Sequence, residues 1–192
     1  MDEHELMVQV QEGNETAFRE IVRIYKDRIV NFLCQLTGDY QKAVELSQET
    51  FMRVYFKAHR YRPIAPLSSW IYSIASNLAK TEMKKMRRVP LISIEEIQNS
   101  LPIEGEGSNP SESSLIRKLR AALDSLHPRY RIPVILKDIE GFSQEEIAQI
   151  LKKPLGTIKA RISRGREYLK RELEKTPRRR NSYSKNEEYQ NG

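Results

Sequence analysis

The sequence predicts an all-α protein with two small helical domains, joined by an acidic flexible linker, of which the second is a helix-turn-helix domain. Apolar residues recur at three- and four-residue steps through most of the chain, which is the period of an amphipathic helix, and strand-like alternation is scarce. Residues 89–113 interrupt this pattern with three prolines, two glycines and five glutamates. We therefore expect an N-terminal domain at 1–88, a linker at 89–113, a C-terminal domain at 114–175 and a disordered tail at 176–192.

The N-terminal domain should hold three long helices. The first ends at Thr37-Gly38-Asp39, and Asp39 can cap the second. After a loop with two prolines, Ser68 or Ser69 can cap the third. The apolar faces of the three helices carry Ile21, Tyr25, Ile29 and Leu36, then Ala43, Leu46 and Val54, then Ile71, Ile74 and Leu78.

Charge is distributed unevenly along the chain, which carries 33 Lys and Arg against 26 Asp and Glu and a net charge of +7. The N-terminal domain has 14 basic and 11 acidic side chains, the linker has five acidic and no basic ones, and the C-terminal domain has 15 basic and 8 acidic ones. Two basic modules on either side of an acidic segment suggest that each module meets a polyanion such as nucleic acid. Surplus surface Lys and Arg also occur in proteins that bind no nucleic acid, so charge alone leaves both interpretations open.

Several classes of protein are excluded by simple counts. No apolar run approaches the roughly 18–20 residues of a membrane span, and residues 1–5 are acidic and polar, unlike a signal peptide. The single cysteine, Cys34, has no partner for an internal disulfide, and the three scattered histidines have no zinc-ligand spacing. We expect a cytoplasmic protein with no metal site, no cofactor and no catalytic residues.

The most specific local pattern lies in the C-terminal domain. Ser143 and Glu146 have the spacing of a capping box and predict the start of a short helix. Lys152-Lys153-Pro154 ends that helix. Two short helices joined by a tight turn, with a basic second helix, predict a helix-turn-helix. The apolar stripe of the second helix consists of Leu155, Ile158, Ile162 and Leu169.

The opposite face of that second helix is where DNA contacts are expected. Ala160, Ser163 and Arg164 point away from the apolar stripe, and Arg or Lys can bind guanine edges or phosphates in a major groove. Thr157, near the helix start, can bind a phosphate together with the free backbone N–H groups there. A solvated basic face without DNA contacts is the alternative. The candidate contact residues are Thr157, Lys159, Ala160, Arg161, Ser163, Arg164 and Arg166.

Two segments of the N-terminal domain are also distinctive. Segment 45–53 places polar side chains opposite Leu46 and Phe51, and it suggests a protein-docking surface, because no His or Asp accompanies its carboxylates. Segment 70–77 is followed by several Lys and Arg residues, and aromatic rings beside cations suit the unstacked bases of single-stranded nucleic acid. For Trp70 a place in the core is the simpler interpretation.

These motifs together resemble those of the bacterial extracytoplasmic-function (ECF) sigma factors. Segment 8–18 is similar to the opening helix pair of that family, segment 43–51 to its helix that binds core RNA polymerase, segment 70–77 to its promoter-melting helix and segment 156–166 to its recognition helix. The four segments occur in the order of the family, and the resemblance covers residues 5–175 apart from the details of the linker. It implies a subunit that binds core RNA polymerase and directs promoter-specific transcription initiation without catalytic activity.

The resemblance also implies a role for each group of residues. The C-terminal domain would touch the polymerase β flap and read the −35 element with the seven residues named above. Residues for docking on the clamp helices of the polymerase β′ subunit would be Glu45, Leu46, Gln48, Glu49, Phe51 and Arg53. Residues for the −10 element of promoter DNA would be Arg60, Tyr61, Arg62, Ser69, Trp70, Tyr72, Asn77, Lys80, Lys84, Lys85, Arg87 and Arg88. The loop 60–69 and Asn77 would accept a base flipped out of that element, and an anti-sigma factor is a further implied partner.

The sequence departs from the family pattern at three positions. Val44 stands where the polymerase-binding helix usually has an acid, and Thr81 stands where an Asp usually follows Asn77 by four residues. Ala160 offers no hydrogen bond, so discrimination at the −35 element must come from its neighbours.

Two other functions remain open at this point. A helix-turn-helix regulator with a sensing or dimerising N-terminal domain would bind duplex DNA without polymerase. An enzyme acting on nucleic acid would need a metal-binding acidic cluster or a nucleophile with a base, and neither Cys34 nor the histidines have such a partner in the sequence.

Overall fold

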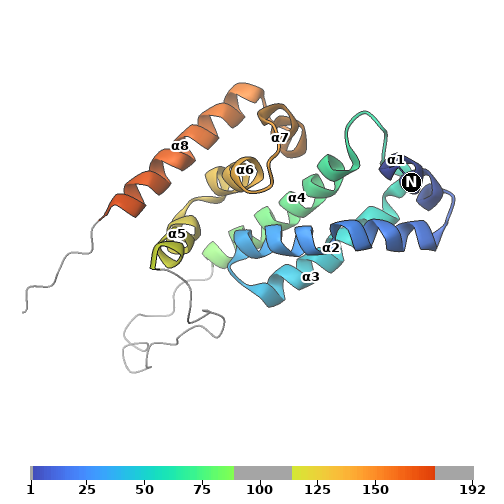
Figure 1. Ribbon diagram of the computed structural model, residues 1–192, viewed down its shortest axis with the longest axis horizontal. Coiled ribbons are helices and arrows are strands. Elements are labelled where there is room, and N and C mark those ends of the chain that lie inside the picture. The colour runs from blue at the N-terminus through green and yellow to red at the C-terminus, as the bar shows by residue number, and fades with distance from the viewer. Residues whose placement is uncertain (1, 89–113, 176–192) are drawn as a thin grey trace, which may run out of the picture.

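The computed structural model describes residues 2–88 and 114–175, and every regular element in these ranges is helical, so the predicted all-α class is confirmed (Figure 1). The predicted linker at 89–113 and tail at 176–192 lie outside the described residues, and the domain boundaries stay a prediction. The elements in chain order are α1 (Glu3–Gln11), α2 (Glu15–Thr37), α3 (Tyr40–Phe56), the short 3₁₀ helix η1 (Ala58–Arg60), α4 (Leu67–Arg88), α5 (Ser114–Ser125), α6 (Pro128–Asp138), α7 (Gln144–Leu151) and α8 (Leu155–Glu174).

The turn between α2 and α3 follows the prediction closely. Gly38 has a φ of 74°, in the left-handed region that favours glycine, and its N–H donates to the Cys34 carbonyl at 2.8 Å. The Asp39 carboxylate accepts the Lys42 N–H at 3.0 Å and caps α3. The chain therefore reverses direction, and α3 packs along α2 while α4 packs against both.

The predicted start of α4 is wrong by two or three residues. Helix α4 begins at Leu67, and the Pro66 carbonyl accepts the Trp70 N–H at 3.4 Å, so Ser68 and Ser69 lie in the first turn instead of capping it. The apolar faces of the three long helices form one core. Its fully buried members include Ile21, Tyr25, Ile29, Leu36, Ala43, Val54 and Ile71.

The predicted helix-turn-helix is formed by α7 and α8. The Ser143 N–H donates to the Glu146 carboxylate at 2.8 Å and the Glu146 N–H donates to the Ser143 hydroxyl at 3.1 Å, so the capping box is present. Helix α7 ends at Lys152, which takes a left-handed φ of 50°. The stripe of α8 is buried at Ile158 and Ile162.

Helices α5 and α6 complete the C-terminal unit. Only the last turns of α5 are buried: Ala122 is 5% exposed, whereas Leu115 and Leu119, at helical spacing before it, are 63% and 39% exposed. Helix α6 crosses α8 closely at Gly165, where an added Cβ would lie 2.6 Å from the Val134 Cγ2 atom. A glycine is therefore needed at this crossing.

The N-terminal and C-terminal helices pack against each other. Helix α7 lies against α4 and helix α6 against α2 (Figure 1). The Tyr72 ring is wholly buried, 5.0 Å from the Phe32 ring of its own unit and 4.9 Å from the Phe142 ring of the other, and its hydroxyl donates to the Glu140 carboxylate. The two sets of helices thus share one continuous core in this closed arrangement.

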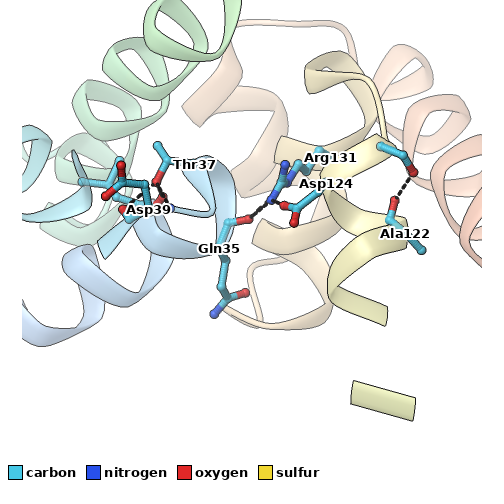
Figure 2. A network of polar contacts seen from close by, with 8 residues as sticks. Gln35, Thr37, Asp39, Ala122, Asp124 and Arg131 are labelled. Atoms are coloured by element: carbon cyan, nitrogen blue, oxygen red, sulfur yellow. Dashed lines mark hydrogen bonds and ion pairs between the residues drawn. The ribbon is translucent and has the colours of Figure 1, made fainter. Parts of the chain in front are cut away.

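A second polar contact joins α6 to the end of α2. The buried Arg131 guanidinium donates to the Gln35 backbone carbonyl, with Nε at 3.1 Å and Nη2 at 2.5 Å, and pairs with the Asp124 carboxylate (Figure 2). Gln35 lies in the last turn of α2, where carbonyl groups have no partner within the helix. The guanidinium supplies that partner and places a positive charge at the negative end of the helix dipole.

Candidate nucleic-acid interface

The side of α8 that is predicted to contact DNA is exposed. Lys159, Ala160, Ser163 and Arg164 are exposed, whereas Thr157 and Arg161 are half-buried at its edge. Ile158 and Ile162, on the other side, anchor the helix in the core. The arrangement leaves a basic surface with short side chains at its centre, which can approach the floor of a major groove.

Arg166 is exposed but already has a partner. Its guanidinium donates to the Asp138 carboxylate of α6, with Nε at 3.0 Å from Oδ2, and this hydrogen bond raises the pKa of Arg166. A DNA phosphate would have to compete with Asp138 for this side chain. Among the seven candidates, Arg166 is therefore held by a neighbouring helix of the protein.

The residues expected to bind the −10 element divide into exposed and buried groups. Arg60, Arg62, Asn77, Lys80, Lys84 and Lys85 are exposed. Tyr61, Ser69 and Tyr72 are 5%, 4% and 0% exposed, so they are not part of a DNA-facing surface in this arrangement. Tyr61 and the half-buried Trp70 stack within the fold at a ring distance of 5.5 Å. The side chains of Arg87 and Arg88 lie outside the described part of the structure.

Asn77 lies within α4, and the predicted loop 60–69 runs into its first turn. Helix α4 begins at Leu67, and ten further residues at about 1.5 Å each put Asn77 about 15 Å along the helix axis. A single pocket of the loop and Asn77 for one flipped base stays a prediction.

The structure does bring the two predicted DNA-facing groups together, which the sequence did not indicate. A cavity of about 260 Å³ lies between the two units. Asn77, Lys80 and Lys84 of α4 line one side, and Lys153 and Arg161 of the helix-turn-helix line another. In the closed arrangement these cations therefore face a shared space.

The predicted docking surface on α3 is only partly exposed. Glu45 and Gln48 are exposed, while Leu46, Glu49 and Arg53 are half-buried and Phe51 is 7% exposed. Glu45 pairs with Lys42 and Glu49 with Arg53, each at 2.6 Å. Phe51 is largely covered, but its side chain lines the groove between α2 and α3 beside this surface.

Large apolar side chains on the same face were missed by the sequence analysis. Met52 and Phe56 are 54% and 68% exposed, and they border a groove of about 910 Å³ between α2 and α3. Together with Glu45, Gln48 and Glu49 they form one helical row, which we call the α3 row. The sequence did contain a signal for this surface. Gln48, Met52 and Phe56 are spaced four residues apart, so they share a helix face that differs from the buried one.

Two other kinds of feature, a metal-binding cluster and a membrane-spanning helix, are absent from the parts of the chain that the structure describes. Residues 2–88 and 114–175 contain no group of three or more His, Cys, Asp or Glu side chains that could hold a metal ion. No helix within these ranges is long and apolar enough to cross a membrane.

Comparisons with known proteins identify the two units. The Sigma-70 region 2 model matches residues 21–89 and the Sigma-70 region 4 model matches residues 116–169. The ECF RNA polymerase sigma factor SigW of Bacillus subtilis is 32% identical over 174 residues, which cover 86% of this chain and 93% of SigW.

Two further comparisons agree with these matches. The ECF RNA polymerase sigma factor SigE of Mycolicibacterium smegmatis is 38% identical over 160 residues, which are 81% of this chain but only 61% of SigE. The solved structure of the sigma factor RpoE from Bartonella quintana, in complex with the anti-sigma factor NepR, has a TM-score of 0.64 at 28% identity and covers 81% of this chain and 96% of that one. The chain therefore belongs to the ECF RNA polymerase sigma factors, which direct promoter-specific transcription initiation.

Proposed function

We propose that this sigma factor docks on core RNA polymerase through the α3 row and reads promoter DNA with α8 and α4, without a catalytic reaction of its own. The observation that carries the proposal is the exposed basic face of α8, which the buried Ile158 and Ile162 hold in a fixed orientation behind the capped helix α7. A recognition helix needs this combination of a rigid base and an accessible polar face.

At the −35 element, side chains on α8 divide between base and phosphate contacts. Ser163 and Arg164 lie in the middle of the exposed face and can reach base edges, with Arg164 suited to guanine. Lys159 and Thr157 lie nearer the helix start, where backbone N–H groups are free to bind phosphate. Ala160 lets the helix approach the DNA and can contact a thymine methyl group.

At the −10 element, both α4 and the loop before it contact DNA. Asn77, Lys80 and Lys84 follow one another at three- and four-residue steps and share a face of α4. An Asn amide can read a base edge, and the two lysines can hold the backbone phosphates beside it. Arg60 and Arg62 are exposed ahead of α4 and would contact the neighbouring nucleotides.

The α3 row provides the surface for core polymerase. Exposed Met52 and Phe56 give it apolar area that a monomer would not normally leave in water, and the carboxylates of Glu45 and Glu49 border that area. We assign this row to the clamp helices of the β′ subunit and the C-terminal unit to the β flap. The area of exposed apolar surface, more than the ion pairs, would supply the affinity.

A second protein partner would control this activity. Because the Bartonella quintana sigma factor was solved with an anti-sigma factor, we propose that an anti-sigma factor also binds this chain. We expect the chain to work in the bacterial cytoplasm, where RNA polymerase meets the chromosome.

Run-off transcription with purified core RNA polymerase tests the proposal. We expect transcripts from a subset of a promoter panel only when core enzyme and this chain are both present. A helix-turn-helix regulator would instead bind the same duplexes equally well without polymerase and would not form a complex with core enzyme. That pair of results would overturn the proposal.

A further inference from the structure

The cavity between the two units has an unusual lining. Part of its lining is apolar and includes Ile132, Pro133 and Leu151. Five cations also line the cavity, and no Asp or Glu does. The five cationic residues are Lys80, Lys84, Arg129, Lys153 and Arg161.

What sets these cations apart is that they gather around one cavity. Some Lys and Arg side chains of the described residues pair with carboxylates, as Lys42 does with Glu45 and Arg53 does with Glu49, whereas others, such as Lys159 and Arg164, have no ion pair among the described residues. Within residues 2–88 and 114–175, none of the five cavity cations has a carboxylate within salt-bridge distance; Arg129 instead stacks on the Tyr130 ring at 4.5 Å. Packing the two units together thus concentrates positive charge that the described residues do not neutralise.

Ser76 supplies an independent observation at the same place. It lines the cavity and is 2% exposed, and its hydroxyl has no hydrogen-bond partner among the described residues. Buried hydroxyl groups without a partner are rare in native structures. The hydroxyl oxygen itself is covered, so an anion oxygen in the cavity can accept its hydrogen bond once the Ser76 side chain rotates toward the cavity.

We propose that this cavity is a binding site for a small multivalent anion of the phosphate class, and that the anion favours the closed arrangement of the two units. The cavity is lined from both units, so it exists only while they are packed together. A ligand that binds one of two arrangements shifts the population toward that arrangement. At about 260 Å³ the cavity is smaller than a typical cofactor pocket, which suits a compact anion.

The anion would also act on promoter binding, and this consequence rests on the proposed function. Lys80 and Lys84 hold backbone phosphates in that proposal, and Arg161 is a contact predicted from the sequence, so an anion held between them occupies the positions of backbone phosphates. The anion and promoter DNA would therefore compete for the same cations.

Inorganic tripolyphosphate is a suitable probe for the full chain. We expect saturable binding by titration calorimetry, a higher melting temperature and a smaller radius of gyration by X-ray scattering. The Lys84→Gln/Lys153→Gln double variant, which removes one cation from each unit, should bind about tenfold more weakly. The control is Lys118→Gln, an exposed lysine of α5 outside the cavity, and it should bind as the wild type does.

The Ser76→Ala variant distinguishes anion binding at this site from nonspecific attraction of anions to a basic protein. Removing an unpartnered buried hydroxyl should not lower the melting temperature of the free protein, but it should weaken tripolyphosphate binding by about threefold. Equal stabilisation by sodium chloride at matched ionic strength, or unchanged affinity in the double variant, would overturn the proposal. These measurements use neither DNA nor polymerase. The anion site can therefore be disproved while the proposed promoter contacts hold, and the promoter contacts can be disproved while the anion site holds.

The carboxylates of residues 89–113 are a second possible source of the same negative charge. A variant with Glu95, Glu96, Glu104, Glu106 and Glu112 replaced by Gln distinguishes the sources. Equal tripolyphosphate affinity in this variant and the wild type supports an anion from solution. Binding that appears only in the variant would show that the chain fills the site itself and would overturn the proposal for a free anion.

Discussion

At the scale of single residues, Gly165 decides how closely α8 can cross α6. A Cβ at this position would lie 2.6 Å from Val134 Cγ2, and Val134 is a stiff β-branched residue that is 3% exposed. Gly165→Ala gains up to about 1 kcal/mol of helix propensity, but overpacking a core costs about 1–3 kcal/mol. We expect a net loss of about 1–2 kcal/mol in the free energy of unfolding, measured by urea denaturation.

Gly156 provides the matched control for this substitution. It lies in the first turn of the same helix, and an added Cβ would meet no atom within 4 Å. Gly156→Ala should therefore leave stability unchanged or raise it slightly. Equal loss in both variants would show that the crossing is not tightly packed.

The buried Tyr72 hydroxyl should make the free energy of unfolding depend on pH in the alkaline range. Burial, and then the hydrogen bond to Glu140, raise the pKa of Tyr72 well above its ordinary value. In the unfolded chain the same hydroxyl ionises near pH 10, so the unfolded state loses its proton first and stability falls as pH rises above about 10. The free energy of unfolding, followed across this range, should fall less steeply in Tyr72→Phe.

The same variant has a second effect at neutral pH. Tyr72→Phe keeps the ring between Phe32 and Phe142 but loses the hydrogen bond to Glu140, at a cost of about 1 kcal/mol. Tyr40→Phe, at a tyrosine that is 62% exposed, should change neither value. An unchanged pH slope in Tyr72→Phe would contradict the burial of this hydroxyl.

At the scale of elements, the α3 row should matter for binding and not for folding. Phe56 is 68% exposed, so Phe56→Ser should change the free energy of unfolding by less than about 0.5 kcal/mol. If the row docks on core polymerase, the dissociation constant should rise about tenfold or more, because exposed aromatic residues often dominate an interface. Competition binding with labelled core enzyme measures this, with Val8→Ser on α1 as a control. Equal affinity of Phe56→Ser and Val8→Ser would exclude Phe56 from the interface.

Helix α8 should show two kinds of DNA contact. Arg164→Ala should cost about 1–3 kcal/mol of holoenzyme binding at one promoter position and relax the preference for its base pair. Lys159→Ala should weaken binding to all promoters alike and reduce the dependence of affinity on salt. A panel of promoters with single base changes, measured at several salt concentrations, separates the two. Identical behaviour of the variants would mean that Arg164 contacts only phosphate.

At the scale of the whole molecule, the closed arrangement cannot bind both promoter elements at once. The −10 and −35 elements lie about 25 base pairs apart, or about 85 Å at about 3.4 Å per pair. In the closed arrangement α4 packs against α7. The axes of two packed helices lie about 8–10 Å apart. The two units must therefore separate before the chain can occupy both promoter elements. The contacts that have to break include the hydrogen bond of Tyr72 to Glu140 and that of Arg131 to Gln35.

Weakening one of these contacts should favour the open arrangement. Glu140→Ala removes the acceptor of the Tyr72 hydroxyl, and we expect a larger radius of gyration by X-ray scattering and a few-fold tighter binding to promoter DNA. Glu145→Ala, at an exposed position of α7, is the control. Equal dimensions and affinities in the two folded variants would show that this contact does not hold the units together.

Much of this protein follows from local sequence alone. The capping box of Ser143 and Glu146, the Gly38-Asp39 turn and the stripe of α2 each depend on residues a few positions apart, and all are predicted correctly. The stripe of α8 is confirmed at Ile158 and Ile162, whereas its end members Leu155 and Leu169 are half-buried. The four family motifs are also local segments, which is why the sequence alone is enough to identify an ECF sigma factor.

Only the tertiary structure decided which of the predicted site residues are accessible. Tyr72 and Glu140 are 68 positions apart, and Arg131 reaches Gln35 across 96 positions. No periodic pattern encodes contacts over such separations, because they depend on how one helical unit packs on the other. That packing buries Tyr72, places Asn77 beside the cations of the helix-turn-helix and creates the cavity between them. The sequence by itself determined the helices, their caps and the family, whereas the arrangement of the DNA-facing residues was set by long-range packing.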